Sequence, residues 1–155
     1  MYEVKDGPRT LQFEGELLGE SSSHHAGSYR WIEFKLYRTV GGTYILSRVG
    51  RSLVFHAPSC PLANKYSLHE VAVDELRDNA TPCPECSPTF EVPVVFPETD
   101  RNWALVAEEP RAVLDALYKW DGRTRYLTKV AERLLTEACD NDSGLDMCWR
   151  VEVIF

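Results

Sequence analysis

Residues 29–49 read YRWIEFKLYRTVGGTYILSRV and carry the clearest structural pattern in the chain. Over residues 29–39 the side chains alternate, with Ile32, Phe34 and Leu36 on one face and Trp31, Glu33, Lys35 and Tyr37 on the other. A period of two residues is typical of a β-strand with one buried face. Val40-Gly41-Gly42 follows and tolerates positive φ, which predicts a turn. Residues 43–49 are therefore expected to return as the partner strand.

The sequence on either side extends this pair into an antiparallel meander. Residues 10–18 predict a weaker strand before it, and residues 52–56 predict a third strand after a reversal at Gly50-Arg51. Residues 21–28 read SSSHHAGS and form a loop by composition. We assign no role to His24 and His25, because a histidine in such a loop is usually only part of the loop.

The cysteine and histidine spacing after this meander predicts a zinc site. His56 and Cys60 are separated by three residues, Cys83 and Cys86 by two, and 22 residues lie between the pairs. Zn²⁺ prefers four nitrogen or sulfur donors in a tetrahedron. Prolines on both sides of Cys83 stiffen the reversal between the second pair. Four protein donors leave no position for water, so the predicted site is structural rather than catalytic.

Two other interpretations of these residues compete with zinc ligation. Buried free thiols with a core histidine are one, and a redox Cys-x-x-Cys is the other. The redox motif normally follows a strand and opens a helix, whereas proline-rich sequence flanks this one. His69 competes as a ligand, but it lies within a predicted helix, where it is expected to be a surface residue. This helix starts at Ser67, which forms a capping box with Glu70, and Asn79 could end it. Cys139 and Cys148 are expected to be small apolar fillers.

Residues 52–88, which end in Pro82-Cys83-Pro84-Glu85-Cys86-Ser87-Pro88, resemble the Ada-type metal-binding fold. The resemblance covers about a quarter of the chain and implies Zn²⁺ ligation by His56, Cys60, Cys83 and Cys86. The chain departs from the family at the first ligand, which is histidine where the DNA-repair members have the methyl-accepting cysteine. Histidine cannot accept the methyl group in that way, so repair by methyl transfer is not implied. A connection to DNA is what remains of the family's function.

The second half of the chain predicts a β-α-α-β unit. Residues 102–107 are a short apolar strand, and Pro110 suits the first turn of a helix. Two apolar stripes at helical spacing follow, one ending at Trp120 and one running from Tyr126 to Ala138, with Asp121-Gly122 as the turn between them. Residues 145–155 alternate and predict a closing strand.

Charge is unevenly distributed. The 155 residues carry a formal charge of −7, which disfavours unspecific binding to nucleic acid or to a membrane surface by the protein as a whole. Residues 28–56 nevertheless hold five basic side chains against one acidic side chain, whereas residues 91–155 hold eight against thirteen. The basic residues Arg30, Lys35, Arg38, Arg48 and Arg51 are interleaved with Trp31, Tyr37 and Tyr44. This combination is also found on nucleic-acid platforms, although a solvated sheet face has it too.

We therefore expect an α+β protein in which residues 1–90 form an antiparallel sheet with the zinc-binding segment and residues 91–155 the β-α-α-β unit, as two domains or one continuous domain. No run of eighteen apolar residues and no basic-apolar leader is present, so a cytoplasmic protein without a membrane span is expected. The expected function is that of a small non-enzymatic, zinc-stabilised protein acting as regulator, adaptor or inhibitor through protein–protein contacts. The alternative is a nucleic-acid-binding accessory module that uses the basic, aromatic sheet of residues 28–56.

Overall fold

The computed structural model describes residues 1–25, 30–52, 54–55, 67–68, 81–82 and 101–154. The chain forms two compact units, each assembled from separate stretches of sequence. The first contains Met1–Ser22, Phe34–Arg48 and Trp103–Phe155, and the second contains Ser23–Glu33 and Val49–Asn102. Both units draw on residues from either side of position 90, which is where the sequence suggested a division.

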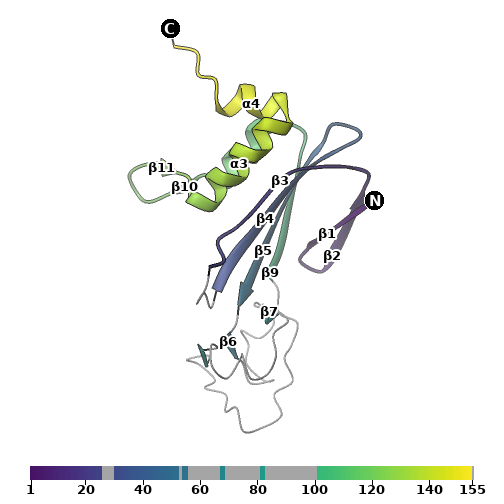
Figure 1. Cartoon of the computed structure of the whole chain (residues 1–155), viewed down its shortest axis with the longest axis vertical. Helices are drawn as coiled ribbons and strands as arrows, with labels where there is room; N and C mark the ends of the chain where they lie inside the picture. Colours follow the sequence, from purple (N-terminus) through teal and green to yellow (C-terminus); the bar gives the residue numbers. More distant parts are fainter. Residues whose placement is uncertain (26–29, 53, 56–66, 69–80, 83–100, 155) are drawn as a thin grey trace. The chain divides into compact units, whose positions relative to one another are not determined.

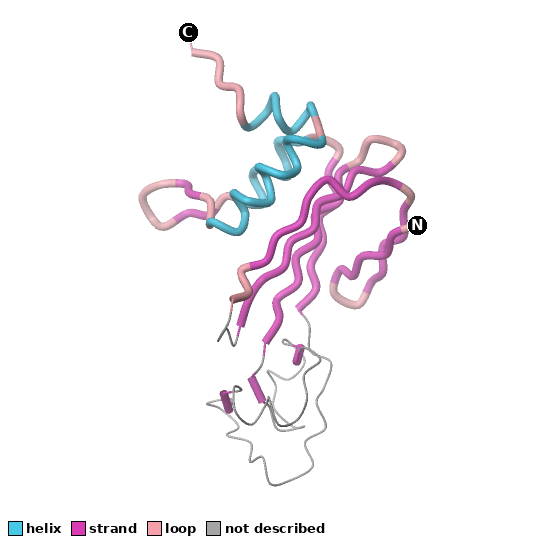
Figure 2. Tube along the Cα trace, in the orientation of Figure 1, coloured by secondary structure: helices cyan, strands magenta, loops and turns pink. Residues whose placement is uncertain are grey.

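Antiparallel strands dominate the main sheet, and helices complete a mixed α+β fold (Figures 1 and 2). The sheet has the order β3-β4-β5-β7, and β9 also pairs with β5. Its strands are β3 (Gly15–Ser22), β4 (Arg30–Thr39), β5 (Tyr44–Ser52), β7 (Ser67–Leu68) and β9 (Arg101–Ala107). The α+β class, the β4–β5 pair and the strand before the helices are therefore confirmed. Ser67 and Leu68 lie in β7, so a helix does not begin at Ser67, and residues 69–79 lie outside the described residues.

The β4–β5 turn forms where the glycines predicted it. The amide of Thr39 donates to the carbonyl of Thr43 at 2.8 Å, and the Thr39 hydroxyl accepts from the Thr43 amide at 3.0 Å. Gly42 has a φ of 89°, which a side chain with a Cβ rarely adopts. The turn therefore depends on glycine at this position.

Both faces of the sheet are covered in the first unit, whereas the sequence pattern predicted one buried face. Leu36 is fully buried on one face of β4, and Tyr37 is 5% exposed on the other. The hairpin of β1 (Tyr2–Asp6) and β2 (Arg9–Phe13) packs on the Tyr37 face. Its core is a cluster of Val4, Tyr37, Ile45 and Ala104, bordered by Tyr2, Leu11 and Phe13.

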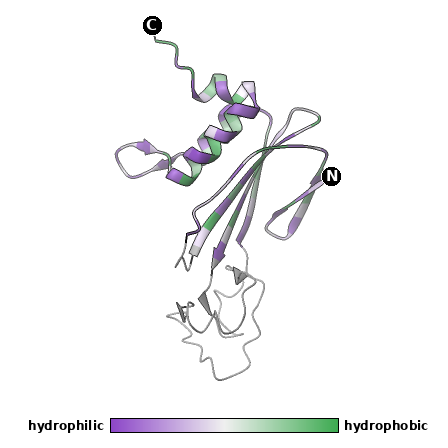
Figure 3. Ribbon diagram, viewed as in Figure 1, coloured by the Kyte–Doolittle hydropathy of each residue, from purple (hydrophilic) through white to green (hydrophobic). Residues whose placement is uncertain are grey.

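Helices α2 (Pro110–Leu117), α3 (Lys129–Asn141) and α4 (Ser143–Trp149) make up the helical part of the first unit. Helix α2 begins with a proline. Helix α3 is capped by the Thr128 hydroxyl, which accepts from the Ala131 amide at 3.3 Å. Helix α3 lies against β3, where a Cβ on Gly19 would come within 3.1 Å of the backbone of Leu134 and Ala138. Hydrophobic and hydrophilic residues alternate along the α3 ribbon in Figure 3. The apolar residues are buried and the polar ones are exposed.

The closing strand predicted over residues 145–155 is wrong. Residues 143–149 form α4, and Val151–Ile154 belong to no helix or strand. The reason is local: the Asp142 carboxylate accepts from the Leu145 amide at 2.9 Å and starts a helix. Leu145, Cys148 and Trp149 then recur at a helical spacing that competes with the alternating pattern.

The predicted helical hairpin is also interrupted. Helix α2 ends at Leu117, and a β-hairpin of β10 (Lys119–Trp120) and β11 (Arg125–Tyr126) separates it from α3. Trp120 and Tyr126, which were assigned to apolar helix stripes, are 64% and 41% exposed in this hairpin. The order after β9 is thus helix, hairpin, helix, helix.

Candidate functional site

The four predicted zinc ligands, His56, Cys60, Cys83 and Cys86, lie outside the described residues. The residues that precede two of them are described. Strand β6 (Val54–Phe55) ends directly before His56, and β8 (Thr81–Pro82) ends directly before Cys83. These strands pair in parallel, with Phe55 opposite Pro82. The chain therefore enters both predicted ligand pairs from the same end of one short ladder.

The described part of the chain offers no alternative metal site. No group of three or more His, Cys, Asp or Glu side chains there could hold a metal ion. Cys139 and Cys148 are free thiols, and burial raises the pKa of Cys139 to about 11. A buried thiol of this kind is unreactive, in agreement with the filler role expected for Cys139.

The five basic residues proposed as a nucleic-acid platform lie in different environments. Arg30 and Arg51 belong to the second unit, and Lys35, Arg38 and Arg48 to the first. Arg51 donates to Glu33 at 2.7 Å. Within the first unit, Lys35 and Arg38 lie at odd and even positions of β4 and so leave it on opposite faces. Lys35 is exposed, whereas Arg38 is engaged with Asp142.

The aromatic rings of the proposed platform are buried. Trp31, Tyr37 and Tyr44 are 5%, 5% and 3% exposed. The Trp31 ring contacts His24 edge to face at 4.5 Å, and its indole N–H donates to Glu33 at 3.2 Å. Stacking on nucleic-acid bases needs an exposed ring face, which these three side chains do not offer.

Asp142 is the centre of a polar cluster that the sequence did not reveal. Its side chain is 1% exposed and accepts from Arg38 Nη1 at 3.0 Å, from the Tyr44 hydroxyl at 2.7 Å and from the Leu145 amide at 2.9 Å. Burial, followed by the hydrogen bond to Asp142, raises the pKa of Tyr44 to about 12. The Arg38 guanidinium also lies 5.6 Å from the centre of the Tyr44 ring. These contacts fix α4 to β4 and β5.

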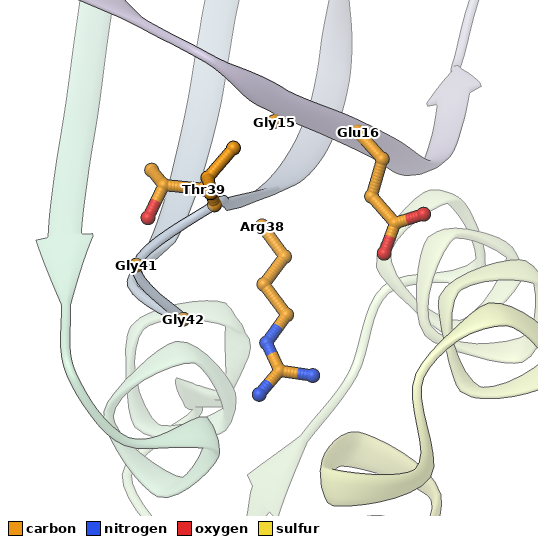
Figure 4. A pocket seen from close by; sticks show the side chains of 7 residues that line it. Gly15, Glu16, Arg38, Thr39, Gly41 and Gly42 are labelled. Carbon is orange, nitrogen blue, oxygen red and sulfur yellow. The ribbon is translucent and has the colours of Figure 1, made fainter.

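A pocket of about 500 Å³ lies beside this cluster, at the β4–β5 turn. Figure 4 shows the extended Arg38 side chain between Glu16 and the Gly41-Gly42 turn. The lining residues are Gly15, Glu16, Arg38, Thr39, Val40, Gly41 and Gly42. Arg38 donates a hydrogen bond to Asp142, and the Thr39 hydroxyl accepts one from the Thr43 amide. The residues that line the pocket therefore include no nucleophile paired with a base. We read the pocket as a by-product of the turn.

Two exposed surfaces were missed by sequence reasoning. One is the β10–β11 hairpin, and the other is the segment from α4 to Ile154, where Met147, Val151, Val153 and Ile154 are 63%, 44%, 69% and 78% exposed. The turn signal Asp121-Gly122 between basic and aromatic residues could have predicted the hairpin. The alternation of residues 151–154 was recognised, but it was assigned to this chain's own sheet.

Comparison with protein-family models, with curated proteins and with solved structures gave no match. None of the helices in the described ranges is long and apolar enough to cross a membrane.

Proposed function

We propose that the chain is a non-enzymatic, zinc-stabilised binding protein that acts as regulator, adaptor or inhibitor through protein–protein contacts. The exposed apolar segment Val151–Ile154 is the observation that carries this proposal. It supplies a contact surface, while the zinc site supplies stability to the second unit.

Zinc binding is supported by the β6–β8 ladder together with the ligand spacing. Neighbouring strands of a sheet lie about 4.8 Å apart, and Phe55 and Pro82 are partners across this ladder. His56 follows Phe55, and Cys83 follows Pro82. The two chain segments that carry the donors thus start side by side. Little further reversal of the chain is needed for the donors to share one ion, which lowers the entropy cost of forming the site. Zinc bound there would hold the second unit together, as structural zinc does in small domains.

Val151–Ile154 have the properties of a strand that lacks a partner. The segment alternates apolar and charged residues as far as Val153, and it leaves α4 as an extended stretch (Figure 3). The described residues also form backbone hydrogen bonds outside their helices and strands, and none of these bonds involves Val151–Ile154. An extended segment of this kind can join the open sheet edge of another protein, where main-chain hydrogen bonds give affinity and alternate side chains give specificity.

The chain's own sheet is a poor acceptor for this segment. Along β3, the carbonyl of Ser22 accepts from Arg133 at 2.8 Å and that of Leu18 from Asn141 at 2.8 Å. On β9, the Ala104 amide donates to the Asp6 carboxylate at 3.1 Å. Side chains that occupy edge groups in this way block strand addition. The preferred acceptor is therefore a different protein with an uncovered sheet edge.

The proposal is tested by replacing both Val151 and Val153 with Asp and comparing the proteins that co-purify from the native host. Val40→Asp is the matched control, because Val40 is 83% exposed at the β4–β5 turn. The double variant should lose a partner that the wild type and the control both retain. In the isolated complex, amide hydrogen exchange should slow at residues 151–154. Equal recovery by all three proteins would overturn the proposal.

The nucleic-acid alternative with Arg30, Lys35, Arg38, Arg48 and Arg51 rests on charge. Phosphate contacts make affinity fall steeply with salt. A mobility-shift experiment at low salt with single- and double-stranded DNA and RNA tests it, and Lys35→Glu is the informative variant because Lys35 is exposed.

A further inference from the structure

The β10–β11 hairpin is anchored at both ends and open at its tip. It leaves α2 after Leu117, which is 4% exposed, and enters α3 before Val130, which is 7% exposed. Every residue from Lys119 to Tyr126 is exposed. Figure 1 shows the hairpin projecting away from α3. Its position is therefore fixed by buried neighbours, while its own side chains face solvent.

The tip is held in one conformation by Asp121. The Asp121 carboxylate accepts from the amides of Arg123 and Thr124, both at 2.8 Å, and the Asp121 amide donates to the Thr124 carbonyl at 3.2 Å. These amide hydrogen bonds lower the pKa of Asp121. Gly122 provides the positive φ of 97° that the turn requires. A tip ordered before binding loses little entropy when a partner arrives.

Each face of the hairpin combines one basic and one aromatic residue. Trp120 is opposite Arg125, and Lys119 is opposite Tyr126. Residues directly opposite in an antiparallel pair share a face. Arg125 is held in place, since it donates to Asp115 at 3.0 Å and lies 4.6 Å from the centre of the Tyr118 ring. Lys119 and Arg123 form no ion pair with any residue in the described part of the chain.

The charge of the hairpin is opposite to that of the chain. Residues 118–126 hold three basic side chains and one acidic side chain, in a protein with a formal charge of −7. Trp120 is 64% exposed in the middle of this basic surface. An apolar protein partner would bury these cations at a cost, whereas a partner with phosphates and flat rings satisfies both kinds of group.

We propose that the β10–β11 hairpin binds single-stranded nucleic acid, with an unpaired base stacked on Trp120. Arg123 at the tip and Lys119 on the opposite face of the hairpin supply positive charge that attracts the backbone phosphates. A single strand is favoured over a duplex because stacking on an exposed ring requires a base that is free of its neighbours. This site is separate from Val151–Ile154, so the protein contact proposed above can fail without affecting it.

The test uses fluorescence anisotropy of end-labelled oligo-dT and oligo-U with the full chain at about 50 mM salt, where phosphate contacts are strongest. Trp120→Ala should weaken binding by about tenfold, the loss typical of one stacked base, and Trp120→Phe should restore most of it. Charge reversal of both Lys119 and Arg123 to Glu should flatten the salt dependence by about one to two units of slope. Because all three side chains are exposed, the melting temperature should not change.

Lys35→Glu is the control that separates the hairpin from the sheet, because it reverses one charge at an exposed position of β4. It is compared with Lys119→Glu alone, which makes the same charge change in the hairpin. Lys35→Glu should leave the affinity within about twofold, because Lys35 lies on β4 and not on the hairpin. The proposal is overturned if neither oligonucleotide binds, if Trp120→Ala binds as well as the wild type, or if Lys35→Glu weakens binding as much as Lys119→Glu. Equally tight binding of polyglutamate would also overturn it, because it would show a surface for acidic protein rather than nucleic acid.

Discussion

The hydroxyl of Tyr44 donates a 2.7 Å hydrogen bond to the carboxylate of Asp142, although 98 positions separate the two residues in the sequence. The same carboxylate accepts from Arg38 and starts α4 at the Leu145 amide. One buried carboxylate thus accepts hydrogen bonds from a guanidinium, from a phenol and from the first turn of α4. The Asp142 side chain therefore links α4 to β4 and β5.

Asp142→Ala should lower the free energy of unfolding by about 2–3 kcal/mol, because it removes the cap of α4 and leaves the buried Tyr44 hydroxyl without its acceptor. The Arg38 charge and the first amides of α4 would lose their acceptor at the same time. Denaturant unfolding measures the change. Asp140→Ala is the control, because the Asp140 side chain is 66% exposed and its ion pair with Arg150 is screened by water. Equal losses for the two variants would contradict the role assigned to Asp142.

Tyr44 should make stability fall in strong base. Its pKa is raised to about 12 in the folded protein, mainly by burial, whereas an unfolded tyrosine titrates near 10. Above pH about 10 the unfolded chain releases this proton first, so the stabilising contribution is complete below that pH and is lost as the pH rises toward 12. Urea unfolding of the wild type and Tyr44→Phe should show a difference that shrinks over this interval. A difference that stays constant would refute the assignment.

Elements set by local sequence were predictable, as β4, β5 and β9 show. Alternation over residues 30–39 and the glycines after Thr39 act within a few positions, so the hairpin follows from them directly. Residues 145–149 show the limit of this reasoning. Their alternation predicted a strand, but the Asp142 cap and the burial of Leu145 favour a helix.

The polar cluster could not be predicted for a different reason. Arg38 was recognised as a basic residue and Asp142 as an acidic one, but 104 positions separate them. Their pairing depends on how α4 packs against β4, which no periodicity encodes. The same holds for Trp31 and Tyr37, whose alternation with charged residues predicted an open face. The zinc ligands, in contrast, depend on short spacings that the sequence displays directly, and their ligation stays a prediction.

Gly15→Ala should destabilise the first unit by about 2 kcal/mol, as overpacking typically does. A Cβ at Gly15 would overlap the carbonyl oxygen of Arg38 and come within 2.8 Å of the Thr39 Cα, and backbone atoms cannot move aside cheaply. Gly41→Ala is the matched control, because the nearest atom to its new Cβ is 3.8 Å away. Thermal unfolding distinguishes the two variants. A loss confined to Gly41→Ala would mean that β3 approaches β4 less closely than described.

The predicted zinc site makes a metal-content experiment decisive. The wild type should bind about one Zn²⁺ per chain, as a closed four-ligand site does, and Cys83→Ser should lose most of it. Removal of the ion by a chelator should lower the melting temperature, because the free energy of binding structural zinc, about 10–16 kcal/mol in finger peptides, is free energy of folding. Cys139→Ser should keep its zinc, since Cys139 is buried in the first unit and belongs to no group of metal-binding side chains among the described residues. If Cys139→Ser lost zinc and Cys83→Ser kept it, the ligands would lie in the first unit, and the ladder between β6 and β8 would need another explanation.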